Sequence, residues 1–386
     1  MRILWTFVGG LGHLAPLLPL ARAAQAQGHE VAVAGSGGLV PRIEEAGFRA
    51  YATSPRPHHD GAPAVRDLTP LEATDAEAAE IEFAQNFGDR GARRMAAELP
   101  GVIEDFRPDL VVRDETDLGT TIAAELLGVP VATHLVLASG LLIRPDLVGP
   151  KLDVVRAEHG LAPDPGLTRL TSGPVLSDFP PSFRSPCSPL PQQPVHYRSA
   201  AAPTRTRARA GRRRVYATLG TIFNKQSGDL FERLLAGLGE VEADVVVTVG
   251  RELDPAQLGP QPPHVRVERF VPQADVLRVI DLVVSHGGSG SLMAALAHRV
   301  PSVLLPLGAD QPHNALRAEE LGVASTLDAA TATPDEIGDR VREVLADAAM
   351  GERCLGVADE LRALPDVGSA VSVLEAFAGT DWTAHR

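Results

Sequence analysis

Two glycine-rich segments that each contain a histidine are the strongest candidates for chemistry in this sequence. Residues 7–13 are Phe-Val-Gly-Gly-Leu-Gly-His, and residues 284–290 are Val-Ser-His-Gly-Gly-Ser-Gly. Each segment follows an apolar run typical of a buried strand and precedes a run typical of a helix. Because the first turn of a helix has unpaired N–H groups and a partial positive charge, such a turn favours an anion. Both segments therefore predict ligand-binding loops.

The second segment is suited to a diphosphate. Glycines at 288 and 290 let the backbone approach the ligand closely, while Ser289 and His286 add neutral donors. No lysine follows the glycines, so the sequence excludes a P-loop nucleotide hydrolase. We expect an anionic ligand held by neutral groups.

The first segment favours acid–base chemistry. His13 suits a general base because the ordinary pKa of histidine lies near 6.5. Gly10–Ala15 also matches the GxGxxA dinucleotide fingerprint, which leaves an NAD(P)-dependent oxidoreductase as an alternative of another class. However, Val31–Ala34 continues into Gly35 without the acid that should grip a ribose. We therefore interpret His13 as a general base.

The elements around these loops alternate between strand and helix in both halves of the chain. This order predicts an α/β protein with two Rossmann-like, doubly wound domains, whose ligands lie in a cleft at the carboxyl ends of both sheets. We place an N-terminal domain at residues 1–200 and a C-terminal domain at 213–386. A linker rich in Pro, Ser and Arg covers about 180–212. Whether the last helix packs back on the N-terminal domain is left open.

The composition of the 386-residue chain excludes several classes. A formal net charge of −13 argues against nucleic-acid binding, which needs a basic face. The only cysteines, Cys187 and Cys354, lack ligand spacing, which predicts neither a disulfide framework nor a zinc site. No apolar run reaches the ~18 residues of a membrane helix, and glycines and prolines interrupt the apolar N-terminus. We expect a cytoplasmic protein with small-molecule ligands, with no membrane or nucleic-acid partner. A homodimer is left open.

Several motifs together resemble the donor-binding signature of family 1 glycosyltransferases. They are Phe270–Gln273, Ser285–Ser291 and Asp310–Ala315, accompanied by Gly12–Leu17 and Tyr216–Thr221. The resemblance is closest to the bacterial enzymes that attach deoxysugars to antibiotics and other natural products. It implies the GT-B fold, inversion at the anomeric carbon and a metal-independent hexosyltransferase reaction.

The resemblance also assigns roles to residues. His13 becomes the base that activates the acceptor, and a carboxylate after the strand at 110–112 orients its ring. We assign that carboxylate to Asp114, with Glu115 and Asp117 as alternatives. The donor contacts implied are Thr221, His286, Gly288, Ser289 and Gly290 for the diphosphate, Phe270, Val271 and Gln273 for the nucleobase, and Asp310 and Gln311 for the sugar.

Two departures from the family pattern favour dTDP over UDP in the co-substrate. Relatives that use UDP-sugars commonly carry Trp where this chain has Phe270, and a ribose-binding Glu where it has Ala294. Alanine cannot bind two ribose hydroxyls, and deoxyribose has one fewer. No Asp-X-Asp pair occurs, so we expect no metal and no other cofactor.

The expected function is transfer of a deoxysugar from a dTDP-sugar to a hydroxyl of a small hydrophobic natural-product aglycone. A GT-B epimerase or hydrolase that acts on the sugar nucleotide itself is the nearer alternative. The acceptor, the sugar and the choice between O- and C-glycosylation are open at this stage.

Overall fold

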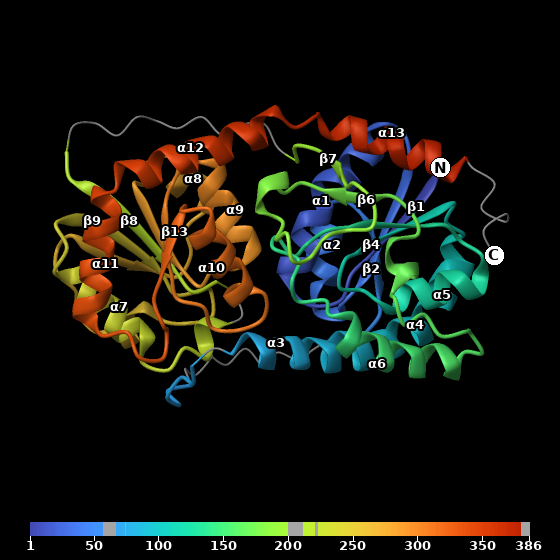
Figure 1. Cartoon of the computed structure of the whole chain (residues 1–386), viewed down its shortest axis with the longest axis horizontal. Helices are drawn as coiled ribbons and strands as arrows, with labels where there is room; N and C mark the ends of the chain where they lie inside the picture. Colours follow the sequence, from blue (N-terminus) through green and yellow to red (C-terminus); the bar gives the residue numbers. More distant parts are fainter. Residues whose placement is uncertain (57–66, 74, 200–210, 221–222, 380–386) are drawn as a thin grey trace. The chain divides into compact units, whose positions relative to one another are not determined.

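The computed structural model describes residues 1–56, 67–73, 75–199, 211–220 and 223–379, which form two compact units (Figure 1). Of the described residues, the N-terminal unit combines 1–56, 80–199 and 364–379. The C-terminal unit holds the described part of 67–79 and residues 211–363. Each unit is built on one parallel sheet.

The sheet of the N-terminal unit has seven parallel strands in the order β3-β2-β1-β4-β5-β6-β7. The strands are β1 (Arg2–Thr6), β2 (Glu30–Gly35), β3 (Arg49–Ala52), β4 (Leu110–Asp114), β5 (Val131–His134), β6 (Val175–Ser177) and β7 (Val195–His196). The helices are α1 (Leu11–Ala26), α2 (Val40–Glu45), α4 (Ala92–Phe106), α5 (Gly119–Leu127), α6 (Pro145–Glu158) and α13 (Val367–Ala378).

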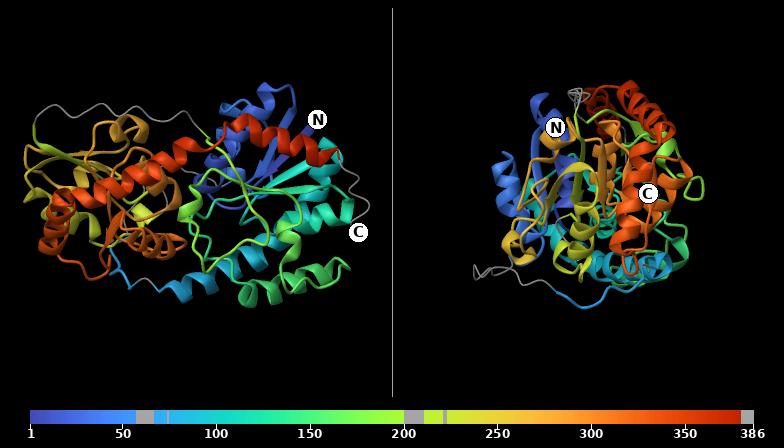
Figure 2. Two further views of the ribbon diagram at one scale, coloured as in Figure 1. Left: turned by 45° about the horizontal axis from the view of Figure 1, so that its top comes forward. Right: turned by 90° about the vertical axis from the view of Figure 1, so that its left-hand side faces the viewer.

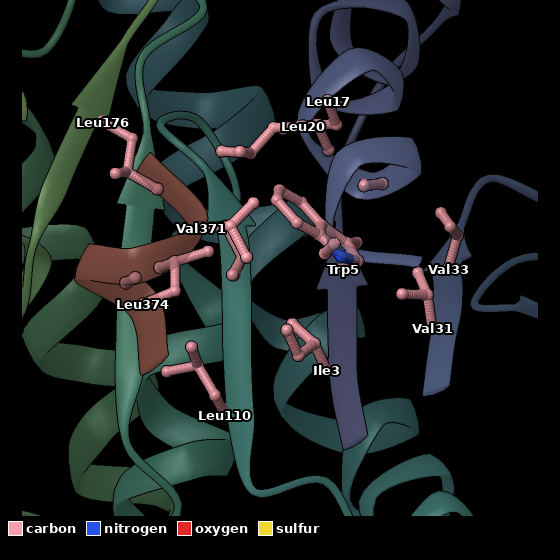
Figure 3. Packing of buried hydrophobic residues seen from close by; sticks show 14 of the residues in the cluster. Ile3, Trp5, Leu17, Leu20, Val31, Val33, Leu110, Leu176, Val371 and Leu374 are labelled. Atoms are coloured by element: carbon pink, nitrogen blue, oxygen red, sulfur yellow. The ribbon is translucent and has the colours of Figure 1, made fainter. Parts of the chain in front are cut away.

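Side chains that alternate along β1 bind helices to both faces of this sheet. Ile3 and Trp5 pack with α1 and α13, whereas Leu4 packs with α4 and α5 on the opposite face. All three side chains are fully buried, and Figure 3 shows the first cluster around Trp5. A strand buried on both faces has no polar alternation, which is why its sequence is a continuous apolar run.

The last helix of the chain belongs to the N-terminal unit. Ala370, Val371 and Leu374 of α13 are fully buried in the same cluster as Leu17 and Leu20 of α1. Figure 2 shows this helix, in red, from two further directions. The last helix thus packs on α1 within the N-terminal unit.

Two segments outside the regular alternation of strands and helices are also structured. The expected linker contains β7 and the fully buried Tyr197, so its first part belongs to the N-terminal unit. The polar stretch before α4 forms α3 (Ala76–Phe83) and then a π-helix, η2 (Ala84–Gly91), that continues into α4. A π-helix of this kind is often found at functional sites.

The C-terminal unit has six parallel strands in the order β10-β9-β8-β11-β12-β13. The strands are β8 (Arg213–Thr218), β9 (Ala243–Thr248), β10 (Val265–Glu268), β11 (Leu282–Ser285), β12 (Ser302–Leu304) and β13 (Ala324–Thr326). The helices are α7 (Leu230–Gly239), α8 (Gln273–Leu277), α9 (Ser289–Ala297), α10 (Gln311–Glu320), α11 (Pro334–Ala346) and α12 (Ala348–Ala363). In the described ranges, no helix is long and apolar enough to cross a membrane.

Each sheet has one topological switch point, where neighbouring strands connect in opposite directions. It lies between β1 and β4 in the first unit and between β8 and β11 in the second. Ligands of open α/β sheets bind outside the carboxyl ends of the strands at such points. His13 follows β1 and Asp114 ends β4, while His286 follows β11 directly. Both candidate loops therefore lie at switch points.

Candidate functional site

His13 lies in the first turn of α1, and glycine at position 9 makes room for its ring. Gly9 has φ +117°, and a Cβ there would lie 2.4 Å from His13 Cδ2 and 2.7 Å from Nε2. The His13 side chain remains 21% exposed, so the ring can still be reached from solvent. A larger residue at position 9 would displace the imidazole.

The buried carboxylate of Asp114 faces this ring. His13 Nδ1 lies 3.3 Å from Asp114 Oδ2 and 3.0 Å from the hydroxyl oxygen of Thr116. Asp114 Oδ2 also accepts the backbone N–H of Val8 at 3.2 Å, and Oδ1 accepts that of Asp117 at 2.9 Å. Because several donors converge on this carboxylate, its orientation is fixed by the backbone around it.

The two alternative carboxylates have other partners. Glu115 Oε1 pairs with Arg184 Nη1 at 3.1 Å, and Asp117 Oδ2 accepts the Thr120 hydroxyl at 2.6 Å. Burial, and next the charge of Asp114, raise the pKa of Asp117 to about 6. Of the three candidates from the sequence, the structure brings Asp114 to the ring of His13.

A buried guanidinium holds the loop after β4. Arg113 is 1% exposed, and burial lowers its pKa against the opposing effect of nearby carboxylates. It donates to the backbone carbonyls of Asp114, Glu115, Asp117 and Leu170 at 2.7–3.2 Å. An arginine inside the apolar run 110–114 was the available signal for this role, and our sequence interpretation missed it.

An aromatic side chain from the π-helix forms a wall beside His13. The Phe87 ring centroid lies 5.7 Å from that of His13, and Phe83 stacks on Phe87 at 4.7 Å. Nothing in the polar sequence around these residues indicated that η2 would place an aromatic ring here. His13 is therefore flanked by an apolar surface on one side and by the Asp114 network on another.

In the C-terminal unit the ring of His286 fits where two glycines lack side chains. A Cβ at Gly220 would lie 2.6 Å from His286 Cε1, and one at Gly288 would lie 2.7 Å from Nε2. Burial lowers the pKa of His286, although the Asp310 carboxylate and the backbone of Thr218 act in the opposite direction. The ring is therefore a neutral group at pH 7.

The N-terminus of α9 has no side-chain cap. Gly288 occupies the N-cap position, and the first turn contains no acidic residue. A Cβ at Gly290 would meet no described atom within 4 Å. The first N–H groups of a helix need a partner, and here a ligand can supply it.

The Ser289 hydroxyl has a different partner from the one expected. It donates to Asp310 Oδ2 at 2.6 Å, and Asn314 Nδ2 donates to the same oxygen at 2.7 Å. The side chain of Gln311 is buried and accepts the backbone N–H of Leu307 at 2.8 Å. Ser289 can still offer its backbone N–H to an anion, while its hydroxyl orients Asp310.

The expected nucleobase residues surround the start of α8. The Phe270 ring is 49% exposed, and the guanidinium carbon of Arg251 lies 3.8 Å from its centroid. One face of the ring is therefore covered by a cation, which leaves the other face for stacking. Gln273 Nε2 is buried without a hydrogen-bond partner among the described residues. It is a donor whose partner a ligand can provide.

Comparison with known proteins gives this geometry its context. Residues 22–220 match the N-terminal domain, and residues 232–377 the C-terminal domain, of the family "Erythromycin biosynthesis protein CIII-like". The chain belongs to this family. It is similar to L-demethylnoviosyl transferase of Streptomyces niveus, with 30% identity over 338 residues and 85% of each chain covered.

Solved structures resemble the glycosyltransferase over its whole length. The glycosyltransferase SnogD from Streptomyces nogalater has 27% identity and a TM-score of 0.74, with 98% of this chain and 99% of that chain covered. Spinosyn rhamnosyltransferase SpnG, complexed with thymidine diphosphate, has 25% identity and a TM-score of 0.78, with coverage of 97% and 100%. The fold is GT-B, as expected, and the enzyme is a natural-product glycosyltransferase. This assignment decides against the oxidoreductase alternative.

The remaining expected residues of the glycosyltransferase can now be located. Thr221 lies outside the described residues. Val271 and Ala294 are partly buried and pack against the cluster of β8, α8, β11 and α9 residues. Where the residues are described, no group of three or more His, Cys, Asp or Glu side chains could hold a metal ion.

A cavity of about 610 Å³ lies in the N-terminal unit beside the loop after β4. Its wall includes the ion pair of Glu115 and Arg184, together with Ile143 and Leu190. Glu115 directly follows Asp114 in the sequence. The run 137–143 contributes Gly140 and Ile143 to this lining.

Proposed function

We propose that this glycosyltransferase moves a deoxysugar from a dTDP-sugar to a hydroxyl of a small hydrophobic aglycone, with inversion and with His13 as the general base. The observation that carries the proposal is the contact of His13 Nδ1 with Asp114 and Thr116. A ring held through Nδ1 leaves Nε2 for the acceptor.

The chemistry follows from these groups. Nε2 of His13 takes the proton of the acceptor hydroxyl while that oxygen attacks the anomeric carbon. The bond from the anomeric carbon to the diphosphate oxygen breaks, and dTDP leaves with the electron pair. The reaction requires the attacking oxygen and the leaving oxygen on opposite sides of the anomeric carbon, which inverts its configuration.

The charge of the leaving dTDP needs stabilisation without a metal. The uncapped N-terminus of α9 offers backbone N–H groups, and His286 offers a ring N–H. Asp310, oriented by Ser289 and Asn314, is suited to accept hydrogen bonds from sugar hydroxyls.

The donor preference rests on the nucleoside side of the site. Ala294 on α9 supplies no acceptor for ribose hydroxyls, and Phe270 offers a smaller stacking surface than tryptophan. The spinosyn rhamnosyltransferase is described in complex with thymidine diphosphate, and the similarity of the two chains supports the same nucleotide here.

Calorimetric titration with dTDP and with UDP tests the donor. We expect dTDP to bind at least about 10-fold more tightly. Equal affinities would contradict the donor assignment and leave the transferase function untouched.

Transfer is tested with dTDP-sugars and a panel of aromatic and macrolide acceptors. We expect a glycoside whose anomeric proton coupling in NMR reports the configuration opposite to that of the donor. The matched control omits the acceptor. Free sugar or an epimeric nucleotide sugar in that control, at the rate of the full reaction, would instead identify a hydrolase or an epimerase.

A further inference from the structure

A hydroxyl lies between the two side chains of the His13–Asp114 pair. Thr116 Oγ1 is 3.0 Å from His13 Nδ1 and 2.7 Å from Asp114 Oδ1. The direct distance from His13 Nδ1 to Asp114 Oδ2 is longer, at 3.3 Å. The threonine hydroxyl is thus closer to this ring nitrogen than the carboxylate is.

The direction of these hydrogen bonds follows from what each group can donate. An ionised carboxylate only accepts, so the single hydroxyl proton of Thr116 is directed to Asp114 Oδ1. The hydroxyl oxygen then presents lone pairs to His13 Nδ1, which must carry the proton of that contact. A neutral imidazole protonated on Nδ1 has its free lone pair on Nε2, the tautomer that a base facing an acceptor requires.

We infer that Thr116 is a positioning residue that holds His13 in the Nδ1-protonated tautomer. Its hydroxyl donates to Asp114 and accepts a hydrogen bond from His13 Nδ1. The inference rests on the proposed role of His13 as base. When Nε2 takes a proton from the acceptor, the imidazolium donates more strongly through Nδ1, and Thr116 keeps its own proton. No proton passes to Asp114.

The surroundings keep this hydroxyl from rotating away. Thr116 is 1% exposed, and its backbone N–H also donates to Asp114 Oδ1. Arg113 Nη1 donates to the carbonyls of Asp114 and Glu115 before Thr116 and of Asp117 after it. The hydroxyl therefore sits on a loop that is fixed on both sides of it.

The test replaces Thr116 with valine, which has nearly the same shape, and with serine as the matched control that keeps the hydroxyl. Thr116→Val removes the hydrogen bond that stabilises the imidazolium of His13. Because a hydrogen bond to a charged group contributes about 1.5–3 kcal/mol, kcat should fall by about 10- to 100-fold. The KM values for donor and acceptor should change by less than about twofold, because Thr116 is buried, at 1% exposure. Thr116→Ser should keep kcat within about threefold of the wild type.

Two further readouts separate positioning from a structural role. In Thr116→Val the acid limb of the kcat/KM profile should move to lower pH, because the imidazolium loses an acceptor. In ¹⁵N NMR spectra of histidine-labelled protein, the His13 signals should change from the Nδ1-protonated form to a mixture of tautomers. If the Thr116→Val variant does not fold, the Thr116→Cys variant serves instead, since a thiol accepts hydrogen bonds poorly.

Some outcomes would overturn the inference alone. Wild-type rates and an unmoved pH profile in Thr116→Val, or equal losses in the serine and valine variants, would exclude a role for the hydroxyl. Failure of the underlying proposal looks different: His13→Ala would then retain activity within a few-fold, whatever Thr116 does.

Discussion

The two switch points of this enzyme present different chemical groups. At the first, between β1 and β4, side chains form a saturated network in which His13, Thr116 and Asp114 fix one another. At the second, between β8 and β11, glycines remove side chains so that backbone N–H groups and one ring can approach a ligand.

The difference matches the task that we propose for each site. A base needs one atom in one protonation state, which a network of specific donors and acceptors provides. A diphosphate spreads its charge over several oxygens, which many unobstructed donors match better than one side chain. Mutations at the first site should therefore affect turnover, whereas those at the second should affect binding.

The largest effect should come from removing the base. His13→Ala should lower kcat by about 10³-fold, because general bases contribute about 10²–10⁴. Affinity for dTDP, measured by calorimetry, should stay within about twofold, since the variant leaves the α9 loop intact. Activity within a few-fold of the wild type would remove His13 from the mechanism.

The next largest effect concerns the free energy of unfolding, which depends on burying Asp117 close to the first network. Asp117 is a buried acid whose pKa rises from 3.8 to about 6. Its proton uptake on folding stabilises the protein below about pH 4, and this contribution is lost as the pH rises through about 6. Between pH 4.5 and 7 the wild type should lose on the order of 2 kcal/mol of unfolding free energy relative to Asp117→Asn. A constant difference between the two proteins across that range would contradict the burial argument.

At the second site, steric changes should weaken donor binding. In Gly288→Ala the new Cβ would lie 2.7 Å from His286 Nε2, so the ring must move. We expect about 10-fold weaker dTDP binding and an unchanged acid limb of the kcat/KM profile. Gly290→Ala is the matched variant, because its Cβ would meet no atom of the described residues within 4 Å. Any loss there reports a clash with the ligand itself, and no loss would place the diphosphate away from Gly290.

The smallest effect tests the covered aromatic ring. Arg251→Ala removes the guanidinium that lies 3.8 Å from the Phe270 centroid. Because an exposed cation–π contact contributes about 0.5–1 kcal/mol, dTDP affinity should fall about two- to fivefold. Tighter binding in calorimetry would mean instead that the guanidinium competes with the nucleobase for the ring.

Much of the fold could be predicted because buried parallel strands are apolar runs with glycine turns after them. The strand at 282–285 and the helices at 230–239 and 334–346 have the bounds that their sequences indicate. The π-helix η2 could not be predicted, since its sequence is polar and its form depends on packing. The place of α13 depends on packing between residues more than 300 positions apart in the chain, since Val371 and Leu17 belong to one cluster.

The site divides in the same way. Motifs located His13 and the α9 loop, since strand–turn–helix units have a local signature. The choice among Asp114, Glu115 and Asp117 needed coordinates, because side-chain directions after a strand depend on the turn. No sequence pattern indicated that Thr116 or Phe87 lies at the site. Their positions beside His13 depend on the fold of the backbone around them.

The return of α13 to the N-terminal unit bears on how hybrid enzymes of this family should be assembled. A chimera joined once, in the linker before β8, would pair α1 of one parent with the last helix of the other. Ala370, Val371 and Leu374 would then meet foreign partners in a fully buried cluster, where mismatched volumes cost stability. The part of the C-terminal unit that follows the linker, residues 211–363, therefore needs a second junction, which lies just before Leu364.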